Sequence, residues 1–205
     1  MPLQNRVQPD GQILAISARG TMTGNRGIIH GPDRVLATKR WSHKAWICCV
    51  LDWQGRKRTL MTGRKWTELF FLDEAAAMAA GHRPCGYCRR AAYTQFVDAW
   101  AGTGARPTAP QIDAALHPAR VRRDRSQVTH TAPLSTLPTG TFIIHNTTPH
   151  LVSAAHLHPY APDGYAHPIP RTGNDHVTVL TPAPMCKVLA NGYTPDLHPT
   201  ALTEA

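Results

Sequence analysis

The first seventy residues contain three runs in which apolar and β-branched side chains are concentrated. The longest run, 45–53, is rich in aromatic and β-branched residues and predicts a strand. A Gln-Gly pair follows it and is typical of a hairpin turn, so we expect residues 57–61 to form the partner strand. Shorter runs at 27–30 and 67–72 predict two further strands, whereas the first twenty residues show little periodicity.

Two helices are expected between residues 73 and 101. Asp73 is a good N-cap for an alanine-rich helix over 74–80, and Gly81 is placed for a left-handed C-terminal stop. A second helix is expected over 89–100, because apolar residues recur there at steps of three and four. These residues are Tyr93, Phe96, Val97 and Trp100, and we assign them to the core.

The second half predicts a helix at each end and short strands between them. The helices are expected over 111–123 and from Pro182 to Ala190. The expected strands are 127–131, 141–145, 151–153 and 177–180. Glycines and prolines between 102 and 110 predict a boundary that separates a domain of residues 1–105 from one of residues 106–205. The pattern therefore predicts an α+β protein with a β-rich C-terminal half.

Basic residues dominate the first half of this 205-residue chain. Its formal net charge is +9, and residues 1–100 carry 15 Lys and Arg against 7 Asp and Glu, with Trp side chains interleaved. Neutralised phosphates release counterions and indoles stack on bases, so we expect a nucleic-acid partner, with a merely solubilising surface as the alternative. The expected nucleic-acid-binding residues are Arg26, Arg34, Lys39, Arg40, Arg56, Lys57, Arg58, Arg64, Lys65, Arg89 and Arg90.

Four of the five cysteines lie between residues 48 and 88. No apolar run approaches the ~20 residues that cross a bilayer, and the first residues lack the apolar segment of a secreted chain. We therefore expect a soluble, cytoplasmic protein without membrane contact, in which clustered thiols hold metal or do chemistry rather than form disulfides.

The motif Cys85-x-x-Cys88 predicts half of a tetrahedral zinc site. A helix that begins at its second cysteine directs the positive end of its dipole towards the thiolates. The adjacent Cys48 and Cys49 cannot simply supply the two remaining ligands, because neighbours on a strand point to opposite faces. We favour Cys49 as the third ligand, with a thioredoxin-type redox pair as the rival interpretation of the motif.

The fourth ligand is open among three residues. His30 is the first choice, because a preceding strand beside 45–53 would place its ring at the level of Cys49. His43 and Cys48 are the alternatives. Any of these sets makes zinc the expected cofactor.

The stretch from Phe70 to Arg89 resembles the N-terminal zinc domain of the Ada DNA-repair proteins. The shared order is a strand, an alanine-rich helix, a Gly-aromatic-Arg-Pro segment and Cys-x-x-Cys-Arg. The resemblance covers roughly residues 30–90, and it implies a small zinc-knuckle domain of short strands and two helices that binds DNA rather than RNA. The whole chain also resembles a family of short bacterial proteins whose role is not assigned.

In the Ada family four cysteines hold zinc, and one of the first two accepts a methyl group from a methylated DNA phosphate. Cys85 and Cys88 correspond to the second pair. The first pair departs from the family, because Cys48 and Cys49 are adjacent here and the family separates its two cysteines. The resemblance thus implies action on modified or damaged DNA through a zinc-bound thiolate, with Cys49 as the candidate catalytic residue.

Two other function classes remain open. His117 and Arg120 share one face of the expected third helix and suggest a small nuclease or phosphodiesterase with a structural zinc. A group of histidines between 145 and 158 would be a further candidate site for that chemistry. No Walker loop, Gly-x-Ser-x-Gly elbow or His-Glu-x-x-His motif is present. A module that binds RNA or protein without catalysis is the third class.

Overall fold

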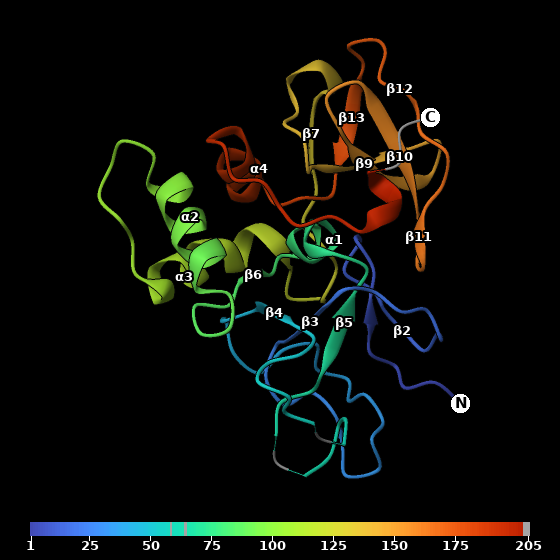
Figure 1. The fold of residues 1–205 in the computed structure, drawn as a ribbon, viewed down its shortest axis with the longest axis vertical. Helices are drawn as coiled ribbons and strands as arrows, with labels where there is room; N and C mark the ends of the chain where they lie inside the picture. The colour runs from blue at the N-terminus through green and yellow to red at the C-terminus, as the bar shows by residue number, and fades with distance from the viewer. Residues whose placement is uncertain (58, 64, 203–205) are drawn as a thin grey trace.

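The computed structural model of the chain describes residues 1–57, 59–63 and 65–202. The described part contains four α-helices and two sheets (Figure 1), which confirms the α+β class and the β-rich C-terminal half. None of these helices combines the length and the apolar character that a bilayer crossing requires.

The first sheet is built from six short strands of the N-terminal half, in the spatial order β2-β1-β5-β3-β4-β6. These strands are β1 (Arg6–Val7), β2 (Ile13–Leu14), β3 (Met22–Asn25), β4 (Ile47–Val50), β5 (Leu69–Phe71) and β6 (Arg83–Pro84). The strands expected over 45–53 and 67–72 are therefore confirmed as the shorter β4 and β5. β1 and β2 occupy residues for which no regular element was expected.

The strand expected over 27–30 is wrong, because the pairing residues lie earlier, in β3. Glycine is uncommon inside strands, so Gly24 weakened the sequence signal for β3. The structure requires glycine there because β4 approaches closely: a Cβ on residue 24 would lie 2.1 Å from the Ile47 carbonyl oxygen. Residues 27–29 instead bond to Thr67, whose N–H donates to the Gly27 oxygen at 3.0 Å and whose Oγ1 accepts from the Ile29 N–H at 2.8 Å.

The hairpin expected between 45–53 and 57–61 is also wrong. Both edges of β4 are already used, because β3 pairs with it antiparallel and β6 pairs with it parallel. Residues 57 and 59–61 form no strand, and Arg58 lies outside the described residues. A sequence-local turn signal was thus overruled by two strands from distant parts of the chain.

All four expected helices are confirmed, with ends shifted by at most three residues. They are α1 (Glu74–Ala79), α2 (Arg90–Ala101), α3 (Ala109–Arg120) and α4 (Ala183–Ala190). Asp73 caps α1 as expected, since its Oδ1 accepts from the Ala76 N–H at 2.9 Å. Gly81 follows α1 with φ +84°, the left-handed conformation expected of a C-terminal stop.

The second sheet contains seven strands in the order β11-β10-β9-β8-β13-β7, with β12 paired to β10. Its strands are β7 (His130–Pro133), β8 (Phe142–His145), β9 (Thr148–Val152), β10 (His156–Ala161), β11 (Gly164–Tyr165), β12 (Ile169–Pro170) and β13 (His176–Val179). Two 3₁₀ turns, η1 (Leu134–Thr136) and η2 (Pro199–Ala201), complete the elements. The sequence missed β10, because alternating histidines and Pro159 hid its pattern.

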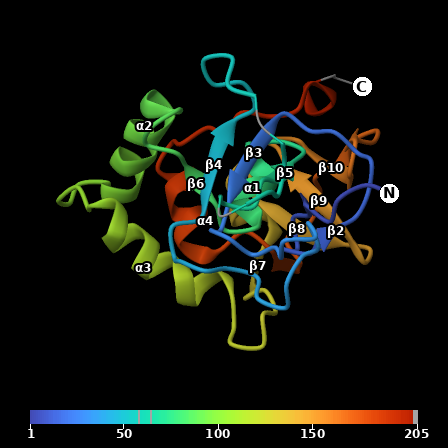
Figure 2. The same ribbon diagram turned by 90° about the horizontal axis from the view of Figure 1, so that it is seen from below.

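α1 lies between the two sheets and is buried on every side (Figure 1). Ala75, Ala76 and Ala79 pack with residues of the second sheet, such as Phe142. Ala77 packs instead with the first sheet, so small side chains allow both sheets to approach one helix. Figure 2 shows α2, α3 and α4 together on one side of this arrangement.

The hydrophobic clusters cross the boundary predicted near residue 105. Phe96 of α2 lies in one cluster with Ile112 of α3 and Val188 of α4. Another cluster joins α1 to the second sheet. The division of the chain into domains of residues 1–105 and 106–205 therefore stays a prediction. The hydrophobic core contains residues from both halves.

Candidate metal centre

The fold brings the two cysteine motifs together through the parallel pair β4 and β6. Cys48 lies opposite Pro84 in the register, and the Cys85 N–H donates to the Cys48 oxygen at 2.9 Å. The turn that contains Cys88 therefore begins directly beside the end of β4. Residues more than thirty positions apart in sequence are fixed next to each other by backbone hydrogen bonds.

The alternation of side chains along β4 separates its two cysteines. Cys48 is fully buried in the hydrophobic core of the first sheet. Cys49 points the other way and joins Cys85 and Cys88, with the three sulfurs all within 4.8 Å of one another. The three cysteines favoured from the sequence are therefore brought together.

Hydrogen bonds among the three cysteines shift their pKa values in opposite directions. The pKa of Cys85 is lowered to about 5, first because the Cys49 thiol donates to its sulfur and further because the N–H groups of Cys88 and Tyr87 point at it. The pKa of Cys88 is lowered for the same first reason, with the Val50 N–H as a second donor. The pKa of Cys49 is raised, since its proton serves both neighbours. The cluster thus favours sulfur anions that a cation would stabilise.

The geometry of the cluster suits a metal ion. Thiolates bound tetrahedrally at about 2.3 Å lie about 3.8 Å from one another, within the observed separation of at most 4.8 Å. Three thiolates are soft ligands, which select metals such as zinc, copper(I) and iron. The described residues supply three ligands to this cluster, which leaves one position of a tetrahedron open.

None of the three candidates for the fourth ligand joins the sulfur cluster. His30 is buried, and its Nδ1 lies 2.6 Å from Thr67 Oγ1, because residues 27–30 follow Thr67 rather than β4. The backbone oxygen of His43 accepts from the Trp46 indole N–H at 3.1 Å, and His43 itself is exposed. Cys48 lies on the core face of β4, where burial raises its pKa well above its ordinary value.

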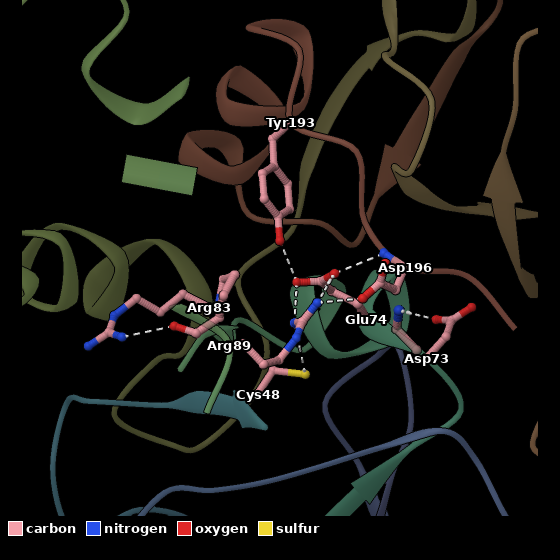
Figure 3. Close-up of polar contacts among 9 residues, drawn as sticks. Cys48, Asp73, Glu74, Arg83, Arg89, Tyr193 and Asp196 are labelled. Carbon is pink, nitrogen blue, oxygen red and sulfur yellow. Dashed lines mark hydrogen bonds and ion pairs between the residues drawn. The ribbon is translucent and has the colours of Figure 1, made fainter. Parts of the chain in front are cut away.

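A buried ionic network that the sequence did not predict lies behind β4 (Figure 3). Arg89 donates to both carboxylate oxygens of Glu74 and, at 2.8 Å, to Asp196 Oδ2. Tyr193 Oη donates to Glu74 Oε1 at 2.5 Å, and an Arg89 nitrogen lies 3.9 Å from the Cys48 sulfur. The one sequence signal for this network was Glu74 at the start of the alanine-rich helix. An acidic residue at that position is typical of helix N-termini in general.

The basic residues expected to bind nucleic acid divide into two groups. Arg26 and Arg89 are buried, and Arg89 is committed to its ion pairs, so neither can act as a free surface contact. Arg40 is half-buried, while Arg58 and Arg64 lie outside the described residues. The remaining residues are exposed and available to a polyanion: Arg34, Lys39, Arg56, Lys57, Lys65 and Arg90.

The cysteine turn also presents aromatic surface, which the sequence analysis did not single out. Tyr87, between the two cysteines of the motif, is 65% exposed, and its ring lies 5.5 Å from that of Trp53. Leu51 is also exposed at the end of β4. Stacking of bases on such rings tolerates any sequence, so the pair is a candidate contact for unpaired or flipped bases.

His117 and Arg120 are neighbours on α3, as their spacing predicts, with 3.4 Å between Arg120 Nη2 and His117 Nδ1. Both are packed against aromatic rings rather than against acids. The His117 ring meets the edges of Trp41 and Trp46, and burial lowers its pKa. In the described part of the chain the cysteine cluster is the single group of three potential metal ligands, so the pair has no second metal site beside it.

The histidines between 145 and 158 form two separate pairs. The rings of His145 and His150 lie 5.2 Å apart on β8 and β9, and those of His156 and His158 lie 6.4 Å apart on β10. Burial lowers the pKa of His150 and of His158.

Comparisons with protein-family models, with curated proteins and with solved structures gave no match to this chain. The functional assignment therefore rests on the site itself: three cysteines, from β4 and from the turn after β6, that can hold a metal ion.

Proposed function

We propose that the protein is a zinc-binding, DNA-binding protein that acts on modified or damaged DNA through a zinc-bound thiolate. The observation that carries this proposal is the approach of the Cys49, Cys85 and Cys88 sulfurs to within 4.8 Å of one another. The exposed cations of the N-terminal half and the resemblance to the Ada zinc domain support it.

Zinc is the favoured metal because thiolate donors suit it and because it has no redox chemistry that would consume the sulfurs. When bound, zinc would keep the cysteines deprotonated at neutral pH while leaving them nucleophilic. Within the chain, the Cys49 thiol and then backbone N–H donors lower the pKa of Cys85 and Cys88, which favours the anionic form that binding requires. The three protein ligands leave room for a fourth that comes from solvent or substrate.

DNA is the favoured partner because the exposed cations lie on the same half of the chain as the sulfur cluster. Lys57 and Lys65 lie between β4 and β5 in the chain, and both are exposed. Exposed Tyr87 lies within the cysteine turn and adds a stacking surface. Phosphate contacts would position DNA, and the ring would meet bases that leave the stack.

The chemistry that the site can perform is transfer of a methyl group to sulfur. Zinc binding would release the Cys49 proton to solvent, and the Cys49 thiolate would attack the methyl carbon of a methyl phosphotriester, forming an S–C bond as the C–O bond breaks. The electron pair leaves with the phosphate oxygen, which becomes a normal phosphodiester anion, and no oxidant or reductant is needed. Cys48 is excluded as the acceptor by its complete burial, whereas Cys49 is half-buried at the cluster.

Metal analysis of single cysteine variants tests the zinc site. Wild-type protein should contain one zinc, and Cys49→Ala, Cys85→Ala and Cys88→Ala should each lose it. Cys186→Ala is the matched control, because Cys186 lies outside the cluster and its thiol donates to the Thr181 oxygen at 3.5 Å. Wild-type protein without zinc, or an equal loss in the control, would contradict the proposal.

Methyl transfer is tested by incubating zinc-loaded protein with an oligonucleotide that carries one methyl phosphotriester. Peptide mass spectrometry should find one added methyl group on Cys49 and none on Cys48 or Cys186. The same oligonucleotide without the methyl group is the control. Zinc-loaded protein that stays unmethylated at Cys49 would sink the acceptor role.

A further inference from the structure

Two arginines are buried around one indole, away from the sulfur cluster. Arg26 is 3% exposed and Arg120 is 2% exposed. Their guanidinium carbons lie 3.9 and 4.0 Å from the ring centroid of Trp46. The indole offsets part of the cost of burying two cations, but a cation–π contact does not replace an opposite charge. Buried charges are ordinarily paired with an opposite charge.

Arg26 has only neutral hydrogen-bond acceptors. Its Nε donates to His82 Nε2 at 3.2 Å and its Nη2 donates to the Ala80 oxygen at 3.5 Å. Within the described residues no carboxylate forms an ion pair with it. The pKa of Arg26 is lowered to about 9, first by burial and then by the nearby charges of Arg120 and Arg40.

Arg120 is likewise held by neutral groups. Its two terminal nitrogens donate to the Gly81 oxygen at 2.7 Å and to the Lys44 oxygen at 2.6 Å, while its Nε has no partner. Asp113 is close enough to act on it, yet both Asp113 oxygens are already bound by Arg83 at 2.8 Å. Burial still lowers the pKa of Arg120 to about 9.

Both arginines line a pocket of about 740 Å³. Arg40 and Arg125 line it as well, so four arginines border one space, and one terminal nitrogen of each of these two donates to the Thr38 oxygen at 3.2 and 3.0 Å. The acid in the lining is Asp10, whose oxygens accept from the backbone and side-chain nitrogens of Gln12 at 3.0 and 2.6 Å. The volume suits a ligand of nucleotide size.

We propose that this pocket binds a phosphoryl group carried by a nucleotide-sized molecule, with Arg26 and Arg120 as the buried cations that meet it. Guanidinium groups bind phosphate oxygens in pairs, and a doubly negative phosphoryl group supplies the counter-charge that two adjacent buried cations lack. The proposal is independent of the metal site, because no cysteine lines the pocket.

Thermal unfolding and calorimetric titration of the full chain test this inference. Inorganic phosphate and adenosine 5′-monophosphate should raise the unfolding temperature above that in sodium chloride of equal ionic strength, and adenosine should not. Arg26→Met should abolish the rise. Arg40→Gln and Arg125→Gln, which change less buried residues, should each weaken binding of the monophosphate about tenfold or more. Arg106→Gln is the matched control, because Arg106 is exposed, pairs with Asp98 and lies outside the pocket.

The source of the phosphoryl group is resolved by comparing a 5′-phosphorylated oligonucleotide with its 5′-hydroxyl form. Tighter binding of the phosphorylated end than of the free nucleotide assigns the site to nucleic-acid termini, and the reverse assigns it to free nucleotides. If Arg26→Met fails to fold, Arg40→Gln and Arg125→Gln still decide the question. Equal unfolding temperatures in phosphate and chloride, or wild-type affinity in both of these variants, would overturn the proposal. Zinc content should stay unchanged in all variants, which separates failure here from failure of the metal site.

Discussion

The carboxylate of Glu74 shows how completely a buried charge must be satisfied. It is 1% exposed and accepts two bonds from Arg89, one from Tyr193 Oη and one from the Asp196 N–H at 2.8 Å (Figure 3). Tyr193 and Asp196 come from the segment after α4, more than a hundred residues away. One side chain therefore ties the C-terminal segment to α1 and to the start of α2.

Replacing Arg89 by Met should destabilise the protein by about 3–5 kcal/mol, because Glu74 would remain buried without its cation. Urea unfolding measures the change. Arg90→Met is the control on the adjacent, exposed position and should change the free energy of unfolding by about 0.5 kcal/mol or less. A second change, Glu74→Gln, should recover part of the loss in the Arg89 variant. Equal stability of the two arginine variants would contradict this role.

The stability of the protein should also fall in mild acid because of His82. This ring is fully buried against Phe71 and Trp46, and its pKa is lowered well below 6.5 by burial and then by Arg26 and Arg120. The unfolded chain takes up a proton near pH 6.5 and the folded chain does not, so stability is full above that pH and is lost below it.

Between pH 7.5 and pH 5.5 this single group should cost about 1.4 kcal/mol of unfolding free energy. Urea unfolding across that range, in wild type and in His82→Gln, isolates the contribution. The variant should be less stable at pH 7.5 but less sensitive to pH. Parallel pH profiles for the two proteins would refute the assignment to His82.

Helix α1 is the element on which both sheets pack, and its N-cap also binds groups outside the helix. Besides capping Ala76, Asp73 accepts from Tyr165 Oη at 2.7 Å and from the His198 N–H at 3.0 Å. At the other end, a Cβ on Gly81 would lie 2.5 Å from Arg120 Cδ. Both ends of this short helix thus position residues that come from later parts of the chain.

Asp73→Ala should cost more than loss of a surface cap, about 2–4 kcal/mol, because it leaves two buried donors unpaired as well. Thr108→Ala is the matched control at the N-cap of α3. Thr108 is exposed, its N–H and hydroxyl both bond Gln111 Oε1 at 2.8 Å, and its loss should cost about 1 kcal/mol. Thermal or urea unfolding compares the two, and equal costs would show that Asp73 is only a cap.

At the scale of the whole molecule, the sulfur cluster and most of the cations lie in the N-terminal half, while the strands of the second sheet carry six of the twelve histidines. Among the described residues of the loop between β4 and β5, the exposed cations Arg56, Lys57 and Lys65 form no ion pair with a described acid, so their charge is available to a polyanion. The buried arginines are held inside the pocket and the ionic network. Electrostatic binding of DNA should therefore depend on the loop rather than on the total charge of the protein.

A double change, Lys57→Gln with Lys65→Gln, should reduce the slope of log affinity against log salt by about 1–2 for duplex DNA. Fluorescence anisotropy of a labelled duplex between about 50 and 200 mM salt measures this slope. Arg106→Gln should leave the slope unchanged, because Arg106, in the loop between α2 and α3, is paired with Asp98 of α2. If the slope fell equally in the double variant and in Arg106→Gln, DNA binding would depend on net charge alone and not on the loop.

Local rules were sufficient for the four helices and for the grouping of Cys49 with Cys85 and Cys88. The capping residue Asp73, the glycine stop at Gly81 and the apolar stripe of α2 each depend on residues within a few positions of one another. Cys48 and Cys49 point to opposite faces because side chains alternate along any strand, whichever strands pair with it. The hairpin after β4 and the strand at 27–30 failed because the edges of β4 were taken by β3 and β6.

The sequence by itself determined the α+β class, the positions of the four helices to within three residues and the choice of Cys49 with Cys85 and Cys88, since these depend on backbone geometry over short stretches. Only the tertiary structure decided that His30 turns to Thr67, that Arg89 is enclosed with Glu74 and Tyr193, and that Arg26 and Arg120 converge on one pocket. Such pairings join residues up to 119 positions apart, and their energy depends on burial that no local pattern encodes.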